Sequence, residues 1–245
     1  MSRSRGLEGH GLLVVGGASG IGLEAARAAV EDGVRVVIAD IDTTGIDEGD
    51  RLSVVRCDAT DAASVREAVV AAVDRLGRLD GVITTVGGAH LAPVEEIDDA
   101  IWQRELDFNL TSAWLVAREA LAVMRPQGSG AIVLTSSGQA LMGAVDRAGY
   151  AAAKAGVISL TRSLAASAAE YGVRVNCIAP GPTDTPRFRA MNGGDEGVEQ
   201  VRAAMPLKEI PRPEDCADMA LYLISPAARA ITGQTVHVNG GLLMP

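Results

Sequence analysis

The sequence predicts an α/β fold in which helices cover both faces of one parallel sheet, and two observations carry this prediction. Short apolar runs rich in Val, Ile and Leu alternate along the chain with longer Ala-rich stretches, and this alternation is typical of β-α-β units. The short runs are continuously apolar, as expected for strands that are buried on both sides. The chain shows no internal repeat and no linker of different composition, so we expect all 245 residues to form a single domain.

The expected elements follow one another in a regular order. The strands are runs of β-branched residues and leucine, and we place them at 12–15, 34–39, 52–56, 82–86, 131–135 and 173–178. The helices are longer and richer in alanine, and we place them at 20–31, 61–76, 99–124 and 148–170. The second helix opens on an acidic turn, while Pro126 and Gly128 end the third.

Two segments fall outside this rhythm. Residues 186–211 contain a glycine-rich stretch, two prolines at the far end and little apolar periodicity. A long irregular segment inside a compact domain is often a lid or a binding loop, so we expect a substrate lid there. Residues 1–9 precede the first strand, and we expect them to form a flexible tail.

Composition excludes several classes of protein. The net charge of −9 leaves no basic stripe that could neutralise the phosphates of a nucleic acid. No stretch is apolar for long enough to span a membrane. The three histidines are too scattered along the chain to suggest a metal site. Cys57, Cys177 and Cys216 are widely spaced and odd in number, which favours buried, reduced thiols in a cytoplasmic protein.

A glycine-rich loop joins the first strand to the first helix. Gly16, Gly20 and Gly22 are spaced GxxxGxG rather than GxGxxG. Glycine permits a positive φ and close approach of the backbone to a bound group. A loop in this position directs free N–H groups and a helix N-terminus at a diphosphate, which indicates dinucleotide binding. The competing interpretation is an ordinary tight turn between a strand and a helix.

An acidic residue stands at the end of the second strand, eighteen residues after the last loop glycine. Asp40 is placed to accept hydrogen bonds from the ribose hydroxyls of an adenosine, and it would repel a 2′-phosphate. Neither the loop nor the residues directly after Asp40 supply an Arg or Lys. This favours NAD over NADP, unless Asp40 only caps the strand end. Asp58 ends the third strand in the same way and either binds adenine or caps a loop.

A tyrosine and a lysine lie at i and i+4 in the last long helix. Tyr150 and Lys154 therefore project from one face of that helix. An ammonium close to a phenol favours the phenolate and so lowers the pKa of the tyrosine. Ser137, at the end of the fifth strand, can hold a substrate oxygen beside the phenol, and Asn109 can order a water that leads to Lys154. In isolation, the pair would favour a packed phenol with a snorkelling lysine; the serine, the asparagine and the glycine loop reverse that preference.

Taken together, these motifs closely resemble the classical short-chain dehydrogenase/reductase family across nearly the whole chain. The matching segments are GGASGIG at 16–22, FNL at 108–110, SS at 136–137, YAAAK at 150–154, NCIAPGPTDT at 176–185 and ITGQTVHVNGG at 231–241. The resemblance implies a Rossmann-type sheet of seven strands in the order 3-2-1-4-5-6-7. It also implies that Tyr150 is the acid/base, Ser137 the substrate-orienting hydroxyl, Lys154 the ribose-binding cation and Asn109 the relay residue.

The resemblance extends to the residues that would hold the ligands. The expected cofactor-binding residues are Gly16, Ser19, Gly20, Ile21, Gly22, Asp40, Ile41, Asp58, Ala59, Val86, Gly87, Tyr150, Lys154, Pro180, Gly181, Thr183 and Thr185. The expected substrate-binding residues are Gly88, His90, Gln139, Met142, Phe188 and Met191. Asp146 and Arg147, like Gln139, are candidates to recognise a polar group on the substrate.

The chain departs from the family pattern at three places. Val15 replaces the usual threonine before the first glycine, and Asn239 stands where many members have aspartate. The usual NNAG after the fourth strand is TTVG, which replaces its central asparagine with Thr85. We expect these changes to affect the packing around the cofactor rather than the Tyr–Lys pair.

The function implied is hydride transfer between a secondary alcohol, or its ketone, and NAD(H), with no metal. Two alternatives remain open at this point. One is an NADPH-dependent 3-oxoacyl or polyketide-type ketoreductase, against which Asp40 argues. The other is a non-catalytic dinucleotide-sensing regulator, which would have no need of the Tyr–Lys pair. The family likeness and the long apolar helices also predict a homo-oligomer, most readily a homotetramer.

Overall fold

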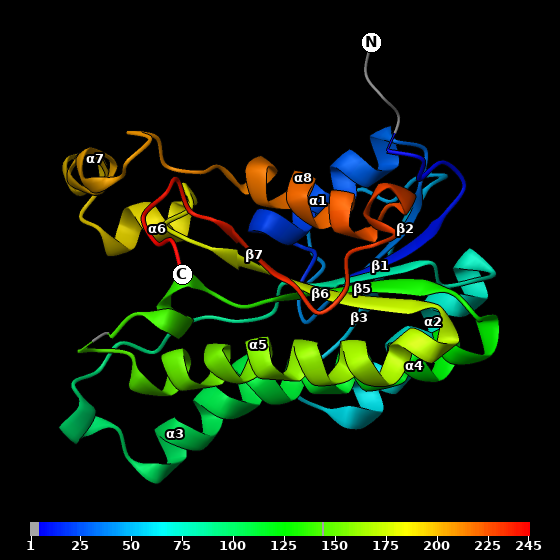
Figure 1. Ribbon diagram of the computed structural model, residues 1–245, viewed down its shortest axis with the longest axis horizontal. Coiled ribbons are helices and arrows are strands. Elements are labelled where there is room, and N and C mark those ends of the chain that lie inside the picture. Colours follow the sequence, from blue (N-terminus) through cyan, green and yellow to red (C-terminus); the bar gives the residue numbers. More distant parts are fainter. Residues whose placement is uncertain (1–4, 144) are drawn as a thin grey trace.

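One seven-stranded sheet forms the centre of the protein. The computed structural model describes residues 5–143 and 145–245, and Figure 1 shows the sheet between two layers of helices. The strands run in the order β3-β2-β1-β4-β5-β6-β7, and every neighbouring pair is parallel. Their bounds are β1 Gly11–Val15, β2 Arg35–Asp40, β3 Leu52–Arg56, β4 Gly81–Thr84, β5 Gly130–Thr135, β6 Val173–Pro180 and β7 Thr235–Val238. This is the expected strand order.

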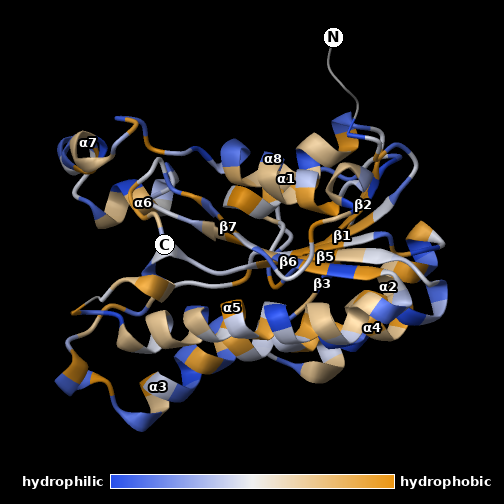
Figure 2. Ribbon diagram, viewed as in Figure 1, coloured by the Kyte–Doolittle hydropathy of each residue, from blue (hydrophilic) through white to orange (hydrophobic). Residues whose placement is uncertain are grey.

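Helices cover both faces of the sheet. Successive residues of a strand point to opposite faces, so these apolar strands present apolar side chains on both faces, and both must be covered. Leu13 and Val15 belong to the core shared with α2 (Ala62–Leu76), α4 (Ser112–Gln127) and α5 (Ala148–Ala168). Leu12 and Val14 belong to the core shared with α1 (Gly20–Glu31) and α8 (Pro213–Ile224). Figure 2 shows that the central strands are largely apolar, as a sheet buried on both faces requires.

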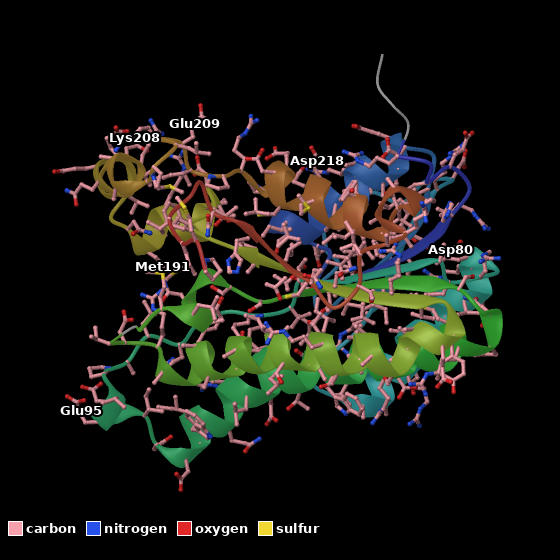
Figure 3. All side chains as sticks on the ribbon, in the orientation of Figure 1. Asp80, Glu95, Met191, Lys208, Glu209 and Asp218 are labelled. Atoms are coloured by element: carbon pink, nitrogen blue, oxygen red, sulfur yellow. The ribbon has the colours of Figure 1, made fainter. Side chains whose placement is uncertain are left out.

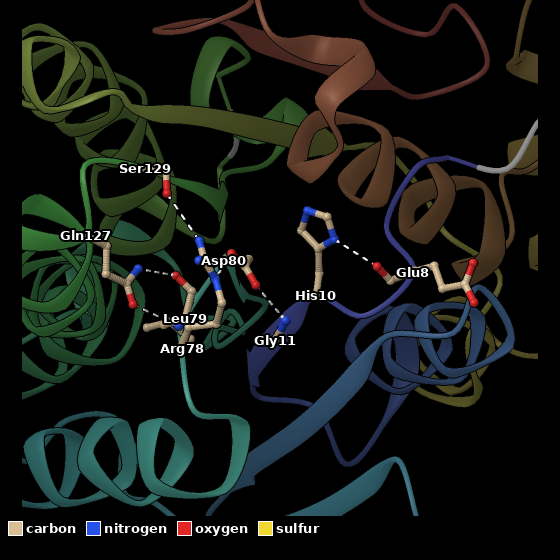
Figure 4. A network of polar contacts seen from close by, with 8 residues as sticks. All are labelled: Glu8, His10, Gly11, Arg78, Leu79, Asp80, Gln127 and Ser129. Carbon is tan, nitrogen blue, oxygen red and sulfur yellow. Dashed lines mark hydrogen bonds and ion pairs between the residues drawn. The ribbon is translucent and has the colours of Figure 1, made fainter.

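A polar network closes the amino ends of the strands, opposite the edge where the motifs gather (Figure 4). Asp80 accepts a hydrogen bond from the backbone N–H of Gly11 at 2.9 Å and another from Arg78 Nε at 2.6 Å. The amide of Gln127 brackets Leu79, donating to its carbonyl at 2.9 Å and accepting from its N–H at 3.1 Å. These contacts tie the starts of β1 and β4 to the end of α4.

The long helix expected at 99–124 is interrupted in the structure. It consists of α3 (Asp99–Leu106), a π-helical turn η2 (Asp107–Thr111) and α4, which ends at the left-handed Gly128. A π-turn inserts one extra residue into the helix and is often found at functional sites. The buried residue of this turn is Asn109, one of the expected site residues.

The segment expected to be an irregular lid is largely helical. It holds α6 (Pro186–Met191) and α7 (Asp195–Ala204). Thr185 caps α6 by accepting a hydrogen bond from the N–H of Phe188 at 3.1 Å. The helices escaped sequence analysis because they are short, and because the apolar face of α7 is narrow: Val198 is the one residue of this helix that is buried.

The N-terminal tail also differs from expectation. Residues 1–4 lie outside the described residues, but the part that follows is packed against the domain. Leu7 is 1% exposed and lies in the core beneath α1 and α8. Arg5 forms ion pairs with Asp32 and Asp218. Residues 5–9 are therefore anchored, because one apolar side chain is buried and one cation is paired.

The described residues contain no helix that is long and apolar enough to cross a membrane. Cys57, Cys177 and Cys216 are all free thiols and all buried. Within the same part of the chain, no three or more His, Cys, Asp or Glu side chains group together in a way that could hold a metal ion.

Candidate active site

A cleft of about 610 Å³ opens at the carboxyl ends of the strands. In open parallel α/β sheets, ligands bind at this edge. The lining comes from the loops after β4, β5 and β6, from the starts of α1 and α5, from the lid and from the C-terminal segment. Figure 3 shows Met191 on the side of α6 that faces the rest of this cleft. Segments far apart in the sequence therefore build one cavity.

Ser137 and Tyr150 both line the cleft. Ser137 caps a short 3-10 turn, η3 (Gly138–Leu141), and its hydroxyl accepts a hydrogen bond from the N–H of Gln139 at 3.2 Å. Tyr150 lies in the first turn of α5. The structure thus brings together the hydroxyl and the phenol that the sequence predicted to share a site.

Lys154 is buried next to Tyr150 and is not among the residues that line the cleft. Its Nζ is 5.9 Å from the centre of the Tyr150 ring, and it donates hydrogen bonds to the carbonyls of Thr135 at 2.9 Å and Val86 at 3.3 Å. The side chain is buried, and burial lowers the pKa of Lys154 to about 8. Two neighbours act in the opposite direction: the Cys177 sulfur, when it is ionised, and the carboxylate of Glu105.

The amide of Asn109 forms hydrogen bonds to the loop after β4 and to Glu105, and its expected role in a water relay stays a prediction. Its Oδ1 accepts from the N–H of Gly88 at 2.9 Å, and its Nδ2 donates to the carbonyl of Gly88 at 3.0 Å. The same Nδ2 also lies within hydrogen-bond distance of the Glu105 carbonyl at 3.0 Å and of its carboxylate at 3.2 Å. The described contacts of this side chain therefore hold the loop after β4 in place.

The glycine loop is built as a tight strand-to-helix turn. Gly16 has a φ of +79°, and Gly20 has a φ of +52°. Gly22 has no room for a side chain, because a Cβ there would lie 2.3 Å from the carbonyl oxygen of Gly16. Thr85 donates its hydroxyl hydrogen to that same oxygen at 2.8 Å. The threonine of the unusual TTVG segment is thus a support of the loop.

Asp40 lies at the end of β2, next to the glycine loop. One carboxylate oxygen accepts from the N–H of Ala18 at 3.0 Å, and the other from the N–H of Asp42 at 3.3 Å. Ile41 is 57% exposed, so its side chain offers an open apolar surface. The sheet register places Arg56 of β3 opposite Asp40. Sequence analysis missed this cation, although matching the ends of the two strands would have found it.

Asp58 is engaged within its own loop. Its Oδ1 accepts from both the N–H and the hydroxyl of Thr60, at 2.9 and 2.6 Å. These hydrogen bonds lower the pKa of the Asp58 carboxyl. In the structure, the Asp58 carboxylate therefore caps its own loop, which is the second of the two roles considered for it. Ala59 follows it and is buried.

The segment after β6 forms the floor of the cleft. Pro180, Gly181, Thr183 and Thr185 all line it. Gly181 packs directly on Asn239, since a Cβ would lie 2.6 Å from the Asn239 Cβ. Asn239 is itself held by hydrogen bonds to the backbone of the C-terminal turn. The asparagine at this position is therefore compatible with a tightly packed floor.

Five of the six expected substrate-side residues line the cleft, and one does not. Those in the lining are Gly88, Gln139, Met142, Phe188 and Met191. His90 is exposed and absent from the lining, and its backbone N–H donates a hydrogen bond to the Glu105 carboxylate at 3.0 Å. The neighbouring Leu91 takes its place in the wall.

Sequence analysis missed other parts of the wall. Leu242 and Leu243 reach the cleft from the C-terminal segment, and Asn192 and Val201 reach it from the lid. No sequence signal marked them, because they follow the last strand or lie in short helices. Asp146 and Arg147, which sequence analysis named as candidates to recognise a polar group, do line the cleft, with two hydrogen bonds of 2.8 and 3.1 Å between their side chains.

The chain is similar to known proteins over nearly its full length. A family model described as enoyl-(acyl carrier protein) reductase matches residues 16–243. A cis-4-hydroxycyclohexanecarboxylate dehydrogenase of Sinomonas cyclohexanicum is 39% identical over 238 residues, covering 94% of each chain. A 3-oxoacyl-(acyl-carrier-protein) reductase of Vibrio cholerae is 32% identical over 97% of this chain and 99% of its own.

A similar crystal structure has been solved for a bacterial protein. It is a putative short-chain dehydrogenase/reductase from Burkholderia xenovorans, 34% identical, with a TM-score of 0.90 over 96% of this chain and 97% of that chain. The likeness extends across the whole sheet and both helical layers, since so little of either chain is left unmatched.

Proposed function

The chain belongs to the short-chain dehydrogenase/reductase family, and on this premise we propose that it transfers a hydride between NAD(H) and a small secondary alcohol or its ketone. One observation carries the proposal. Ser137 and Tyr150 line the same cleft, and the ammonium of Lys154 lies 5.9 Å from the centre of the phenol ring. A non-catalytic sensor of dinucleotides would have no use for this arrangement.

The residues present fit a nicotinamide dinucleotide. The positive φ of Gly16 and the absence of any room for a side chain at Gly22 leave the backbone and the start of α1 free to approach a diphosphate. Asp40 would hold the adenosine ribose, and Lys154 the ribose next to the nicotinamide. The floor at Pro180–Thr185 would hold the nicotinamide amide. When bound, this cofactor supplies the acceptor or donor of the hydride.

The chain's own side chains supply the acid–base chemistry. In oxidation, Tyr150 as a phenolate accepts the proton of the substrate hydroxyl while the hydrogen on the carbinol carbon leaves as a hydride. Ser137 donates a hydrogen bond to the same oxygen and fixes its position. Lys154 contributes positive charge that favours the phenolate. In reduction, the same groups act in reverse and Tyr150 returns the proton.

NAD is the proposed cofactor because a carboxylate stands at the end of β2. The 2′-hydroxyl of NAD would donate to Asp40, whereas the 2′-phosphate of NADP would be repelled. The opposing argument is Arg56, which the register places beside Asp40 and which could bind a phosphate. Because Arg56 lies beside Asp40, we keep an NADPH-dependent 3-oxoacyl reductase as the second candidate function.

The cleft favours a compact substrate. Its volume of about 610 Å³ includes the space above the floor, where the nicotinamide would lie, so only part of this volume is left for a substrate. The remaining walls are mainly apolar, with Leu91, Met142 and Phe188 among them. Arg147 is paired with Asp146, which leaves the wall with little net charge. We therefore propose a ring or short-chain secondary alcohol, with cyclohexanols as the first compounds to test.

The proposal is tested by assaying the purified chain with each cofactor on a matched panel. The panel contains cyclohexanol, the cis and trans isomers of 4-hydroxycyclohexanecarboxylate, and a 3-oxoacyl thioester. Oxidation of a ring alcohol with NAD supports the proposal. Turnover of the thioester with NADPH and of nothing else would favour the second candidate. Binding of dinucleotide without turnover on any wider alcohol panel would favour a sensor.

A further inference from the structure

Two charged side chains are buried in the part of the chain that the structure describes: Lys154 and Glu105. Lys154 belongs to the proposed catalytic set, but nothing so far assigns a role to Glu105. A buried carboxylate is costly unless hydrogen bonds and a nearby cation compensate for lost hydration. At 5% exposed, Glu105 should therefore have partners that explain its presence.

The partners of Glu105 are the loop and the amide beside the cleft. Its Oε1 accepts from the N–H of His90 at 3.0 Å, and its Oε2 accepts from Asn109 Nδ2 at 3.2 Å. Asn109 in turn clamps both the N–H and the carbonyl of Gly88. One carboxylate therefore holds the wall segment 88–90 at both ends, directly through His90 and indirectly through Asn109.

The residue that precedes this wall segment, Gly87, lies against Lys154. A Cβ on Gly87 would come within 2.6 Å of Lys154 Nζ and 2.8 Å of Asn109 Oδ1. The other side of Glu105 packs on α5, since a Cβ on Gly149 would lie 3.0 Å from the Glu105 Cβ. Gly149 directly precedes Tyr150. Glu105 thus lies between the loop that faces Lys154 and the turn that carries the phenol.

We infer that Glu105 is a positioning residue of the active site: its carboxylate holds the wall segment 88–90 and Asn109 in place, and its charge sustains the ammonium of Lys154. The catalytic part of this inference rests on the proposed function, whereas the electrostatic part can be measured without any turnover.

Glu105 is the anion available for this electrostatic role. Among the residues that the structure describes, three titratable groups interact with the ammonium of Lys154: Tyr150, Cys177 and Glu105. Burial raises the pKa of the Cys177 thiol to about 11, so this thiol is neutral at ordinary pH. A carboxylate favours the charged form of a nearby lysine. Removal of the Glu105 charge should therefore lower the pKa of Lys154.

The chain is well suited to a direct measurement, because it contains only two lysines, Lys154 and Lys208. Isotope labelling of lysine gives two NMR signals, and the Lys208→Arg variant identifies the one from Lys154. Titration would compare wild type, Glu105→Gln and Glu95→Gln. Gln at 105 has the same size and can still accept from His90. Glu95 is exposed, so Glu95→Gln removes the same charge from a distant surface site.

We expect the Lys154 midpoint to move to lower pH in Glu105→Gln and to stay unchanged in Glu95→Gln. The Lys208 midpoint should stay constant in both. An unchanged Lys154 midpoint in a folded Glu105→Gln protein would overturn the electrostatic role. Because this experiment needs neither cofactor nor substrate, its result does not depend on the proposed function.

Activity then tests the positioning role. On a substrate found with the panel above, we expect kcat/KM to fall at least about tenfold in Glu105→Leu, which removes both hydrogen bonds and the charge. Glu105→Gln should recover part of this loss and shift the pH profile of kcat in the direction in which Lys154 moves. Wild-type kinetics in both variants would overturn the inference, while Tyr150→Phe separately reports on the proposed function.

Discussion

The ammonium of Lys154 lies 5.9 Å from the centre of the Tyr150 ring and is anchored there by the carbonyl oxygens of Thr135 and Val86. The charge is thus placed close to the phenol, and Lys154 is not among the residues that line the cleft. It can influence the ionisation of Tyr150 without occupying the space that a substrate needs. This relationship underlies the first two predictions.

Tyr150→Phe should abolish most turnover while leaving dinucleotide binding nearly unchanged. The phenol is proposed to act on the substrate proton, and general acid–base help is worth about 10²–10⁴ in rate. Steady-state kinetics and a fluorescence titration with NADH measure the two effects separately. Activity within about twofold of wild type would be incompatible with the proposed role of Tyr150.

Lys154→Met should change the pH dependence of stability. Burial lowers the pKa of Lys154 to about 8, whereas an unfolded lysine titrates near ~10.4. Between these values the unfolded chain binds more protons, so the free energy of unfolding of wild type rises with pH over this window. Below about pH 8 the full cost of the buried charge is present, of the order of 3 kcal/mol at most.

Removing the charge removes this pH-dependent cost. We therefore expect the stability of Lys154→Met relative to wild type to be highest below about pH 8 and to decline as pH rises towards about 10. Denaturant unfolding at a series of pH values measures the difference, and Lys208→Met is the exposed control. A difference that does not vary with pH would show that Lys154 is not charged and buried in this way.

Asp40→Ala should narrow the preference for NAD over NADP. A hydrogen bond to a charged group contributes about 1.5–3 kcal/mol, so we expect wild type to discriminate by at least about tenfold in kcat/KM. The variant loses the bond to NAD and the repulsion of NADP. Equal use of both cofactors by wild type would place Asp40 away from the ribose.

Arg56 supplies a second test of the same region. If Arg56 contributes to residual NADP use, Arg56→Gln in the Asp40→Ala background should raise the KM for NADP and leave the KM for NAD nearly unchanged. Arg51→Gln is the matched control, because Arg51 is also exposed but lies at the opposite end of β3. The same loss with both cofactors would indicate damage to the fold rather than a lost phosphate contact.

Gly22→Ala should weaken dinucleotide binding. The added Cβ would lie 2.3 Å from the Gly16 carbonyl and 2.6 Å from the Thr85 hydroxyl. Overpacking of this kind costs about 1–3 kcal/mol, so we expect the Kd for NADH to rise about tenfold or more. Gly49→Ala is the control, because nothing lies within 4 Å of a Cβ there. Unchanged binding by Gly22→Ala would mean that the loop does not hold the diphosphate.

The chain should form a homotetramer in solution. Trp102, Phe108 and Trp114 of the α3–η2–α4 segment are 40%, 39% and 39% exposed, so this segment presents three large aromatic side chains to a partner. Light scattering at micromolar concentration measures the assembly, and Trp114→Glu should reduce its size. A monomeric wild type would contradict the prediction. A Trp114→Glu variant that still forms the tetramer would contradict the role of Trp114.

Local sequence determined the features that depend on neighbours along the chain. Tyr150 and Lys154 share a helix face because 3.6 residues make one turn, and no tertiary contact can alter that spacing. The role of the loop glycines could be predicted for the same reason. A strand that is followed by a helix within a few residues requires a tight turn, and glycine permits one. Continuous apolar strands likewise required helices on both faces of the sheet.

Tertiary structure decided whatever depends on residues far apart in the sequence. The pairing of β2 with β3 set Arg56 opposite Asp40, and packing of α3 against α5 buried Glu105 beside the wall of the cleft. His90 lies outside the lining of the cleft, and its backbone N–H is held by that carboxylate. These placements follow from sheet register and helix packing, whose energies are summed over many distant contacts and leave no short pattern to read.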